Sequence, residues 1–386
     1  MSLKQAHVVH VTTAHAAEDV RIFHREAKLL VPHCGRVTVV AADCGGTHHG
    51  VDFVAWAERS PRGRLARVRA AGKAAKTAAD LRAQLYHFHD PELMVPMGAL
   101  ARKRRVPVIY DVHEHYRGTL YENSGGGLRG RAAAVAYGLA EWYSLGAFAG
   151  IVTVTPQIAA MYVGRARRVA LVRNLPNMDD IVAATSSRTV DTAACRLVYS
   201  GSVSQRALYP LAEAVRSLVG RFPSITVRVV GDFRDQVERE RMVSHWRQAG
   251  VADRLRFVGR MPREAFLESL SGDSVGLVLF WPTPNAGVAL PNKLFEYMAC
   301  GLPVVVPNLP NQRAIVEEYG CGVWCDTTEP GSIAAAITGL LEDPEASARM
   351  GERGRQACQT TYRADADLPA LTTVYEDCLK DVGALE

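Results

Sequence analysis

Short runs of β-branched and other apolar residues alternate with longer helical segments along the whole chain. This alternation predicts parallel β-strands covered by α-helices. In the first half, we expect strands to begin at His7, Arg36, Asp52, Tyr86, Val106, Gly150 and Val169, with helices over 21–30, 92–104 and 131–147. The second half repeats the pattern, and its strands are expected to begin at Arg196, Ile225, Arg254, Ser274, Pro303 and Gly322.

A polar stretch rich in Ser, Thr and Ala separates the two halves over residues 175–194 and is typical of an interdomain linker. We therefore predict an α/β protein with two Rossmann-like, doubly wound parallel-sheet domains, 1–174 and 195–364, that face each other across a cleft. Open parallel sheets bind ligands beyond the carboxyl ends of their strands, so chemistry is expected there.

Length, charge and cysteine usage narrow the class of protein to which the chain can belong. The chain has 386 residues, which suits two domains, and a formal net charge of +5, which fits an anionic ligand without implying nucleic acid. Its 8 cysteines form no CxxC pair and predict reduced thiols rather than a zinc site. No apolar run approaches the length of a membrane span, and we predict a cytoplasmic protein.

The segment LPNKLFEYMACGLPVVVPN, from Leu290, carries the most specific chemistry. Pro291 ends the incoming loop, and Asn292 is expected to cap a helix that begins near Lys293. Lys293 would lie in the first turn, where the helix dipole favours an anion, and Glu296 one turn further on the same side. This pair suits a diphosphate beside a ribose diol, although a surface Lys–Glu pair that supports the helix is the alternative.

The turn in LVYSGSVSQRAL is a second candidate for phosphate binding. Gly201 permits close backbone approach, Ser202 follows it, and Arg206 adds a positive charge where a helix begins. An ordinary strand-to-helix turn with a solvent-facing arginine explains the same residues.

In the first half, two neighbouring strands end in histidines and carboxylates. The side chains concerned are His87, His89 and Asp90 in YHFHDPE, and Asp111, His113, Glu114 and His115 in YDVHEHY. We favour a polar sugar-binding surface, with a metal site as the less supported alternative because the ligand spacing is weak evidence. Partly exposed histidines remain an alternative for His87 and His115.

Two further features concern the first half. Asp19 is placed to cap the helix whose first turn contains Arg21, and Arg21 itself has a structural interpretation. A basic, Ala-rich helix over 62–82 either contacts anionic membranes weakly or, more commonly for such stretches, presents a solvated face.

Taken together, these motifs resemble glycosyltransferase family 4, whose members have the GT-B fold. The pieces are DVRIFHREAKLL, HDPEL, DVHE, YSGSVSQRAL, FVGRMP and PNKLFEYMACGLPVV, in family order across nearly the whole chain. The PNKLFEY segment places it with a subgroup of the family. The resemblance implies a donor site in the second domain, an acceptor site in the first, and a C-terminal helix over about 365–386 that packs back on the first domain.

The resemblance also implies roles for single residues. Glu296 matches the ribose-binding glutamate, His113 a histidine near the transferred sugar, and Arg206 with Lys293 the basic pair on the diphosphate. Arg260 and Met261 fall where the family's loop lies against the base. His89, Asp90, Asp111 and Glu114 would belong to the sugar and acceptor side.

The implied reaction is a metal-independent hexosyl transfer with retention at the anomeric carbon and no cofactor. The donor would be a UDP- or GDP-linked sugar, and the acceptor would belong to cell-surface glycan, lipid or natural-product biosynthesis. Peripheral contact with the inner membrane face fits such acceptors.

Three positions depart from the family pattern. Val288 stands eight residues before Glu296, where a second glutamate is common; Ser202 replaces a basic residue; and Ala16 with Ala17 replace a glycine pair. These changes leave the recognition of the donor sugar undetermined.

Three other functions are compatible with parts of the pattern. A nucleotide-sugar epimerase of the same fold would need paired acid/base carboxylates, and we place none. A dinucleotide-dependent oxidoreductase would need G-x-G-x-x-G after a strand, and none follows the first strand of either half. A catalytically inactive carbohydrate- or nucleotide-binding protein is the third.

Overall fold

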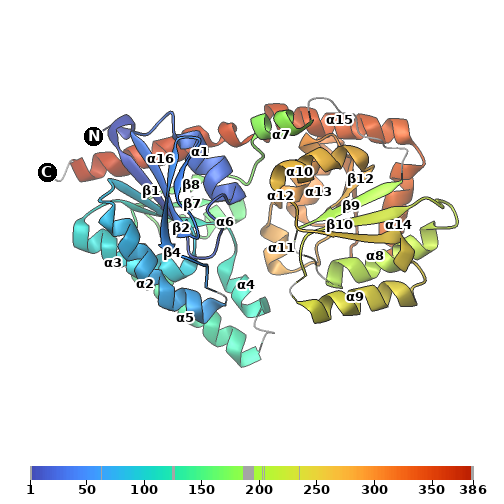
Figure 1. Cartoon of the computed structure of the whole chain (residues 1–386), viewed down its shortest axis with the longest axis horizontal. Coiled ribbons are helices and arrows are strands. Elements are labelled where there is room, and N and C mark those ends of the chain that lie inside the picture. Colours follow the sequence, from blue (N-terminus) through green and yellow to red (C-terminus); the bar gives the residue numbers. More distant parts are fainter. Residues whose placement is uncertain are drawn as a thin grey trace. The chain divides into compact units, whose positions relative to one another are not determined.

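The computed structural model describes residues 2–61, 63–123, 127–185, 195–201, 203, 205–233 and 235–383. The chain forms two compact units (Figure 1). The first comprises Met1–Asn174 and Ala364–Glu386, and the second comprises Leu175–Arg363. Among the described residues, no helix combines the length and apolar character needed to cross a bilayer.

The first unit is built on an eight-stranded sheet in the order β3-β4-β2-β1-β5-β6-β7-β8. All neighbouring pairs are parallel except β3 with β4. The strands are β1 His7–Val11, β2 Arg36–Ala42, β3 Gly46–His48, β4 Val51–Ala57, β5 Leu85–Phe88, β6 Val108–Val112, β7 Gly150–Thr153 and β8 Val169–Leu171. The order reverses between β1 and β5, which is where a doubly wound sheet binds ligands.

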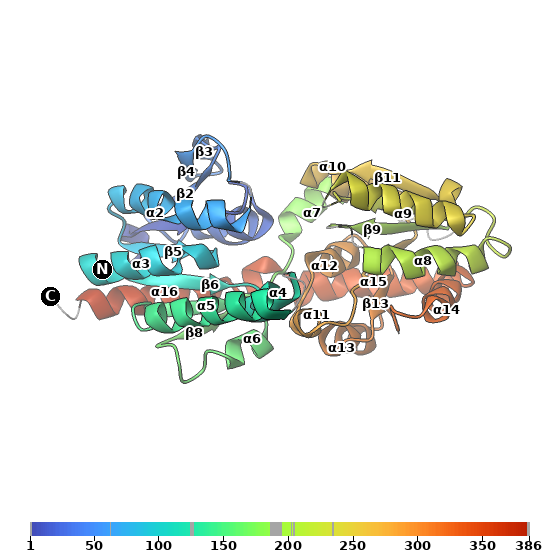
Figure 2. The ribbon, with the colours of Figure 1, turned by 90° about the horizontal axis from the view of Figure 1, so that it is seen from below.

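Helices cover both faces of this sheet. The π-helical η2 Val20–Ala27, α1 Lys28–Leu30 and α16 Leu368–Gly383 lie on one side, and α2 Arg64–Asp80, α3 Met94–Arg104 and α5 Gly127–Leu145 lie on the other (Figure 1). In the second view α2, α3 and α5 follow one another across their face (Figure 2). The shorter helices are η1 Leu3–Gln5, η3 Pro91–Leu93, α4 Tyr116–Asn123, α6 Pro156–Ala160 and η7 Ala364–Ala366.

The last helix completes the core of the first unit. Leu371, Val374, Tyr375 and Cys378 of α16 are buried among side chains of the first 172 residues. Apolar positions at this helical spacing form one face, and that face packs against β7 and β8. The structure thus has α16 in the place expected for the returning helix, with Ala364 rather than residue 365 as the first residue of the return.

The second unit has a six-stranded, fully parallel sheet in the order β11-β10-β9-β12-β13-β14. Numbered within the unit, this is the order 3-2-1-4-5-6 of the Rossmann fold. The strands are β9 Arg196–Ser200, β10 Thr226–Val230, β11 Leu255–Gly259, β12 Val275–Leu277, β13 Val304–Pro307 and β14 Gly322–Cys325.

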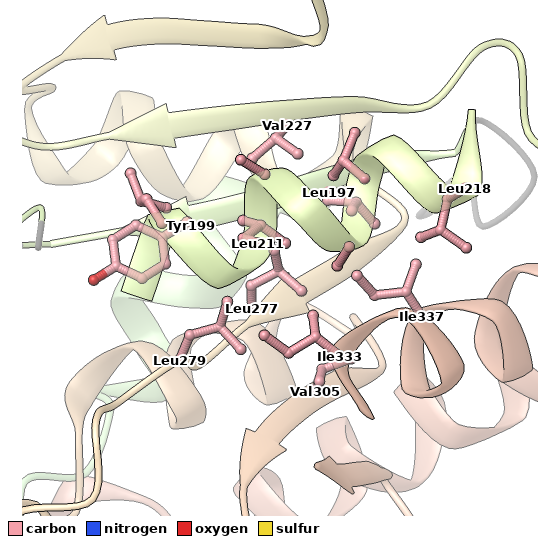
Figure 3. Close-up of a cluster of buried hydrophobic side chains, with 14 of the residues drawn as sticks. Leu197, Tyr199, Leu211, Leu218, Val227, Leu277, Leu279, Val305, Ile333 and Ile337 are labelled. Carbon is pink, nitrogen blue, oxygen red and sulfur yellow. The ribbon is translucent and has the colours of Figure 1, made fainter. Parts of the chain in front are cut away.

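Two apolar clusters cover the two faces of the second sheet. One packs α8 Gln205–Leu218, α9 Gln236–Gln248 and α14 Pro330–Leu341 on the strands, with Leu211, Leu277 and Ile333 at its centre (Figure 3). The other packs the helices of the opposite face, which are α7 Met178–Thr185, α10 Arg263–Ser269, α12 Asn292–Ala299, α13 Pro310–Tyr319 and α15 Pro344–Thr360.

The first part of the expected linker belongs to the second unit instead. Leu175, Met178 and Ile181 are buried in its core, and α7 packs on α10. Their apolar side chains recur at helical spacing and bury one face, which composition alone did not reveal. Residues 186–194 lie outside the described residues.

Candidate functional site

In the second unit, the start of α12 positions the side chains of the PNKLFEY segment. Asn292 is the first residue of the helix and Pro291 occupies the cap position, so the prediction that Asn292 caps the helix was wrong. Every residue from Lys293 to Ala299 is buried. A lysine and a glutamate in the first turns of a buried helix are not a surface pair, which removes the simpler explanation of the motif.

The Lys293 ammonium group lies at the carboxyl end of β9. Its Nζ is 4.0 Å from the ring centre of Tyr199 and 5.4 Å from that of Phe280. A Cβ placed on Gly201 would lie 3.6 Å from Nζ. Burial lowers the pKa of Lys293 to about 7, and the nearby Glu296 carboxylate opposes that shift. Lys293 is therefore a cation that lacks solvation and gains from an anionic ligand.

The turns after β9 and β10 each require a glycine. Gly201 has φ +100°, and a Cβ on Gly231, after β10, would come within 1.9 Å of the Gly201 carbonyl oxygen. The amides of Gly201 and Val203 already donate to the carbonyls of Val230 and Asp232. These two amides are thus engaged within the fold, and the amides at the start of α8 remain the ones predicted to meet a phosphate. Ser202 lies outside the described residues.

Glu296 contacts an arginine that sequence reasoning missed. Arg263, the first residue of α10, donates from Nη1 to Glu296 Oε1 at 2.5 Å. Its Nε and Nη2 are buried and have no hydrogen-bond partner among the described residues. The only signal was its place two residues after Met261 in FVGRMPRE, and nothing in the sequence linked it to a glutamate 33 positions away.

The remaining predicted donor residues follow the carboxyl ends of other strands. Arg206 is the second residue of α8 and is exposed, Arg260 follows β11 and is exposed, and Met261 packs against the core. Because the strands are parallel, these positions share one edge of the sheet with Lys293. Their common role stays a prediction.

In the first unit, two of the predicted sugar-contacting residues are inaccessible. His89 and Asp111 are fully buried, and His89 Nδ1 donates to Asp111 Oδ2 at 2.8 Å. Asp111 also accepts two hydrogen bonds from Arg21, and although burial raises its pKa, Arg21, His113 and His89 hold it well below its usual range. Both residues lie beneath the surface, so the prediction that they contact a sugar was wrong. His87 is likewise fully buried, so the alternative interpretation as a partly exposed histidine does not hold for it.

Asp90 anchors the loop that follows β1. Its Oδ2 accepts from the Thr12 hydroxyl at 2.7 Å and from the backbone amides of Thr13 at 2.6 Å and Ala14 at 3.1 Å. His15 in the same loop lies 3.1 Å from Asp90 Oδ1. Burial lowers the pKa of His15, but the hydrogen bond and charge of Asp90 raise it to about 9 overall. Sequence reasoning missed this charged histidine, because its partner lies 75 positions away.

His113 and Glu114 line a cavity of about 1010 Å³ within this unit. His113 Nε2 lies 3.0 Å from the Tyr116 hydroxyl, and its ring meets that of His15 edge-on at 5.3 Å. The polar residues of the lining are His15, Arg67, Arg69, Asp90, Glu92, His113, Glu114, Tyr116, Thr119 and Tyr137. Apolar groups of α2, α3, α4 and α5 form most of the rest, so the cavity joins a polar end to an apolar wall.

Comparisons with known proteins match each half of the chain to a glycosyltransferase family model. Residues 197–357 match "Glycosyl transferases group 1", and residues 21–178 match "Glycosyl transferase 4-like domain". The chain is similar to glycogen synthase of Mycobacterium tuberculosis H37Rv, with 23% identity over 96% of this chain and 89% of that protein.

Two solved structures share the fold over nearly the whole chain. Sucrose-phosphate synthase from Thermosynechococcus elongatus has a TM-score of 0.76 at 14% identity and covers 99% of this chain and 100% of its own. Anabaena HepE, in complex with UDP and glucose, has a TM-score of 0.71 at 14% identity and covers 96% and 99%. Such low identity shows the fold alone.

Proposed function

The chain belongs to the group 1 glycosyltransferases and has their GT-B fold, and from that premise we propose a retaining transfer of a hexosyl group from a UDP- or GDP-linked donor without a metal ion. The observation that carries the proposal is the buried Lys293 ammonium group beside Gly201, with Glu296 one turn further along α12. A buried cation next to a carboxylate is matched by a diphosphate next to a ribose.

Charge compensation is the main task in such a transfer. As the bond between the anomeric carbon and the diphosphate breaks, negative charge grows on the departing phosphate oxygen. Lys293 and Arg206 would stabilise this charge, and these two side chains would take the place of a divalent cation. Arg263 fixes the Glu296 carboxylate, whose oxygens would accept from the ribose hydroxyls. The base would lie near Arg260 and Met261, with Asn292 at the start of α12 close to the diphosphate.

The transferred sugar would react with an acceptor hydroxyl on the face that the diphosphate leaves. The bond from the hydroxyl oxygen to the anomeric carbon forms as the bond to phosphate breaks. The hydroxyl proton passes to the departing phosphate oxygen, so no separate base is needed. His113, held by Tyr116, would contact the sugar, and His15, Asp90 and Glu114 would line the acceptor side.

The cavity of the first unit supports an acceptor with an apolar portion. Its polar end contains His113 and Glu114, while side chains of α2 and α3, including Val68 and Val95, form an apolar wall. We keep cell-surface glycan precursors, lipids and natural products as the acceptor classes. Residues 64–80 of the basic stretch 62–82 form α2, and weak, salt-sensitive contact with anionic lipid is proposed for the stretch. Arg62 lies outside the described residues.

A donor panel tests the proposal directly. At equal concentration, the UDP- or GDP-linked sugar that binds most tightly should raise the melting temperature of the protein most, and one of the panel should be hydrolysed or transferred. Brief EDTA treatment should leave the rate unchanged, and added Mg²⁺ or Mn²⁺ should not raise it. Restoration of a lost activity by either ion would refute the metal-independent mechanism, and inversion at the anomeric carbon would refute retention.

Vesicle sedimentation tests the membrane contact separately. Binding should be weak, increase with anionic lipid and fall with salt. Equal binding to neutral vesicles would exclude the electrostatic contact without touching the assignment of the donor site.

A further inference from the structure

Four ionisable side chains meet in the interior of the first unit, apart from the cavity. His10 lies on β1, His87 on β5 and His89 directly after β5, while Glu26 comes from η2. His10 and His87 are neighbours across the two strands, and His87 and His89 point to one face because they are two residues apart. All four are fully buried, and one ligand atom from each lies within 4.8 Å of all the others.

The distances from Glu26 to the three histidines are too long for hydrogen bonds and are compatible with a common central ion. Glu26 Oε2 lies 3.7 Å from His10 Nδ1 and 4.0 Å from His89 Nε2. His87 would ligate through Nε2, because its Nδ1, 3.6 Å from Glu26 Oε2, contacts the Tyr375 hydroxyl at 2.6 Å. His10 Nδ1 lies 3.0 Å from His89 Nε2. Ligand atoms about 2.0–2.1 Å from a tetrahedral metal ion are roughly 3.3 Å apart, which lies within the range of these values and nearer to its lower end.

Glu26 is the group that most needs a partner. Neither of its oxygens takes part in a hydrogen bond with a described residue, and the same is true of His87 Nε2. Arg21 Nη2 lies 3.1 Å from Oε1, so one oxygen faces a positive charge, whereas Oε2 points among the three imidazoles. A buried carboxylate oxygen without a donor costs several kcal/mol, of the order of that for other unpaired buried polar groups.

The surrounding residues resemble the outer layer of a metal site. His89 Nδ1, the nitrogen away from the cluster, donates to Asp111, which Arg21 holds in turn. The Tyr375 hydroxyl of α16 lies 2.6 Å from His87 Nδ1 and 3.4 Å from His10 Nε2. Carboxylate and hydroxyl partners of this kind orient imidazoles and fix their tautomers in metal sites.

We propose that His10, Glu26, His87 and His89 form a closed, structural zinc site that ties β1, β5 and η2 together. Three imidazole nitrogens with one carboxylate oxygen select zinc over magnesium or calcium, which prefer oxygen ligands. Full burial leaves no open position for water or substrate, so the ion would stabilise the fold and take no part in transfer. The proposal is independent of the metal-free chemistry assigned to Lys293 and Arg206.

Metal analysis of the full chain, produced without a histidine tag in zinc-supplemented medium, tests the site. We expect one equivalent of zinc after gel filtration. We also expect that refolding with Co²⁺ gives the visible absorption of a tetrahedral N/O site. The Glu26→Gln and His87→Gln variants should lose the metal, whereas the matched variants Glu18→Gln and His48→Gln, from an exposed pair, should keep it.

A second measurement covers variants that fail to fold. The wild-type protein, opened in urea with a chelator and refolded, should show a lower melting temperature that zinc restores and magnesium does not. A folded wild-type protein with far less than one equivalent of zinc and no cobalt absorption would overturn the proposal. The cluster would then be a hydrogen-bonded network that shares protons instead. Retention of zinc by folded Glu26→Gln and His87→Gln variants would also overturn it.

Discussion

Arg21 holds Asp111 through two parallel hydrogen bonds, from Nε to Oδ2 at 2.6 Å and from Nη2 to Oδ1 at 2.7 Å. The same guanidinium donates from Nη1 to the Val172 carbonyl and the Asn174 side chain. One residue of η2 thus fixes the end of β6 and the segment after β8. Asp111 in turn accepts a hydrogen bond from His89 and lies 3.8 Å from His113 Nδ1. The Arg21–Asp111 pair therefore supports the predicted sugar site from beneath.

Removing this arginine should therefore destabilise the first unit strongly. Arg21→Ala leaves Asp111 buried without its partner, which costs about 3–5 kcal/mol for such pairs. Hydrogen exchange of peptides from β1 and β6 in urea measures the loss for this unit alone. Arg36→Ala breaks the exposed pair with Asp52 and is the control, expected to cost at most ~1 kcal/mol. Equal losses for the two variants would contradict a structural role for Arg21.

Nucleotide binding should depend on pH through Lys293. Its pKa of about 7 in the free protein lies below the usual 10.5, and a bound diphosphate favours the charged form. The affinity for UDP or GDP is thus highest below pH 7 and falls as the pH rises through 7, by up to about tenfold per unit. Calorimetry between pH 6 and about pH 9 tests this. Lys293→Arg stays charged and should lose the dependence; an unchanged slope in that variant assigns it to another group.

Glu296 and Arg263 should act as one unit in donor binding. Glu296→Gln is expected to weaken the affinity for the nucleotide by about 1–3 kcal/mol, since a charged acceptor for the ribose hydroxyls is lost. Arg263→Ala should weaken it too, and the double variant should lose less than the sum because the two side chains are in contact. Glu317→Gln, from the exposed pair with Arg313, is the matched control. Strict additivity would separate Arg263 from the function of Glu296.

The two units should separate nucleotide binding from turnover. Ala at Lys293 or Arg206 should weaken binding of the bare nucleoside diphosphate and also slow transfer. His113→Ala should leave nucleotide binding nearly intact and still lower kcat, because a contact made with the reacting sugar alone appears in the rate. Tyr116→Phe removes the hydroxyl beside His113 Nε2 and should give a smaller loss of kcat. If His113→Ala loses nucleotide binding while Lys293→Ala keeps it, the donor binds in the first unit and the assignment to the second unit is wrong.

The fold was accessible from the sequence because strand and helix periods differ clearly. The β-branched runs became the strands of two doubly wound sheets, and Asp19 caps its helix through bonds to the amides of Arg21 and Ile22, as predicted. The linker over 175–194 was less accessible, since Leu175 and Met178 look like isolated apolar residues in a polar stretch until α10 is seen against them.

For the candidate sites, the sequence predicted several of the residues but not the contacts between them. The PNKLFEY segment identified Lys293 and Glu296, yet Arg263 and the salt bridge of His15 with Asp90 depend on contacts far along the chain. We expected the strand-end histidines to form a polar surface because charged and polar residues are mostly exposed. His87, His89 and Asp111 are buried only because Arg21, Glu26 and Tyr375 come from distant helices to meet them.

The return of α16 to the first sheet has a consequence for how the protein is made. The second unit is one continuous stretch of chain, so all of its core residues are present once residue 363 has emerged from the ribosome. The first unit is not complete at that point, because Tyr375 and its neighbours on α16 are translated after the whole of the second unit. The half whose translation begins first is thus the half whose core is completed last.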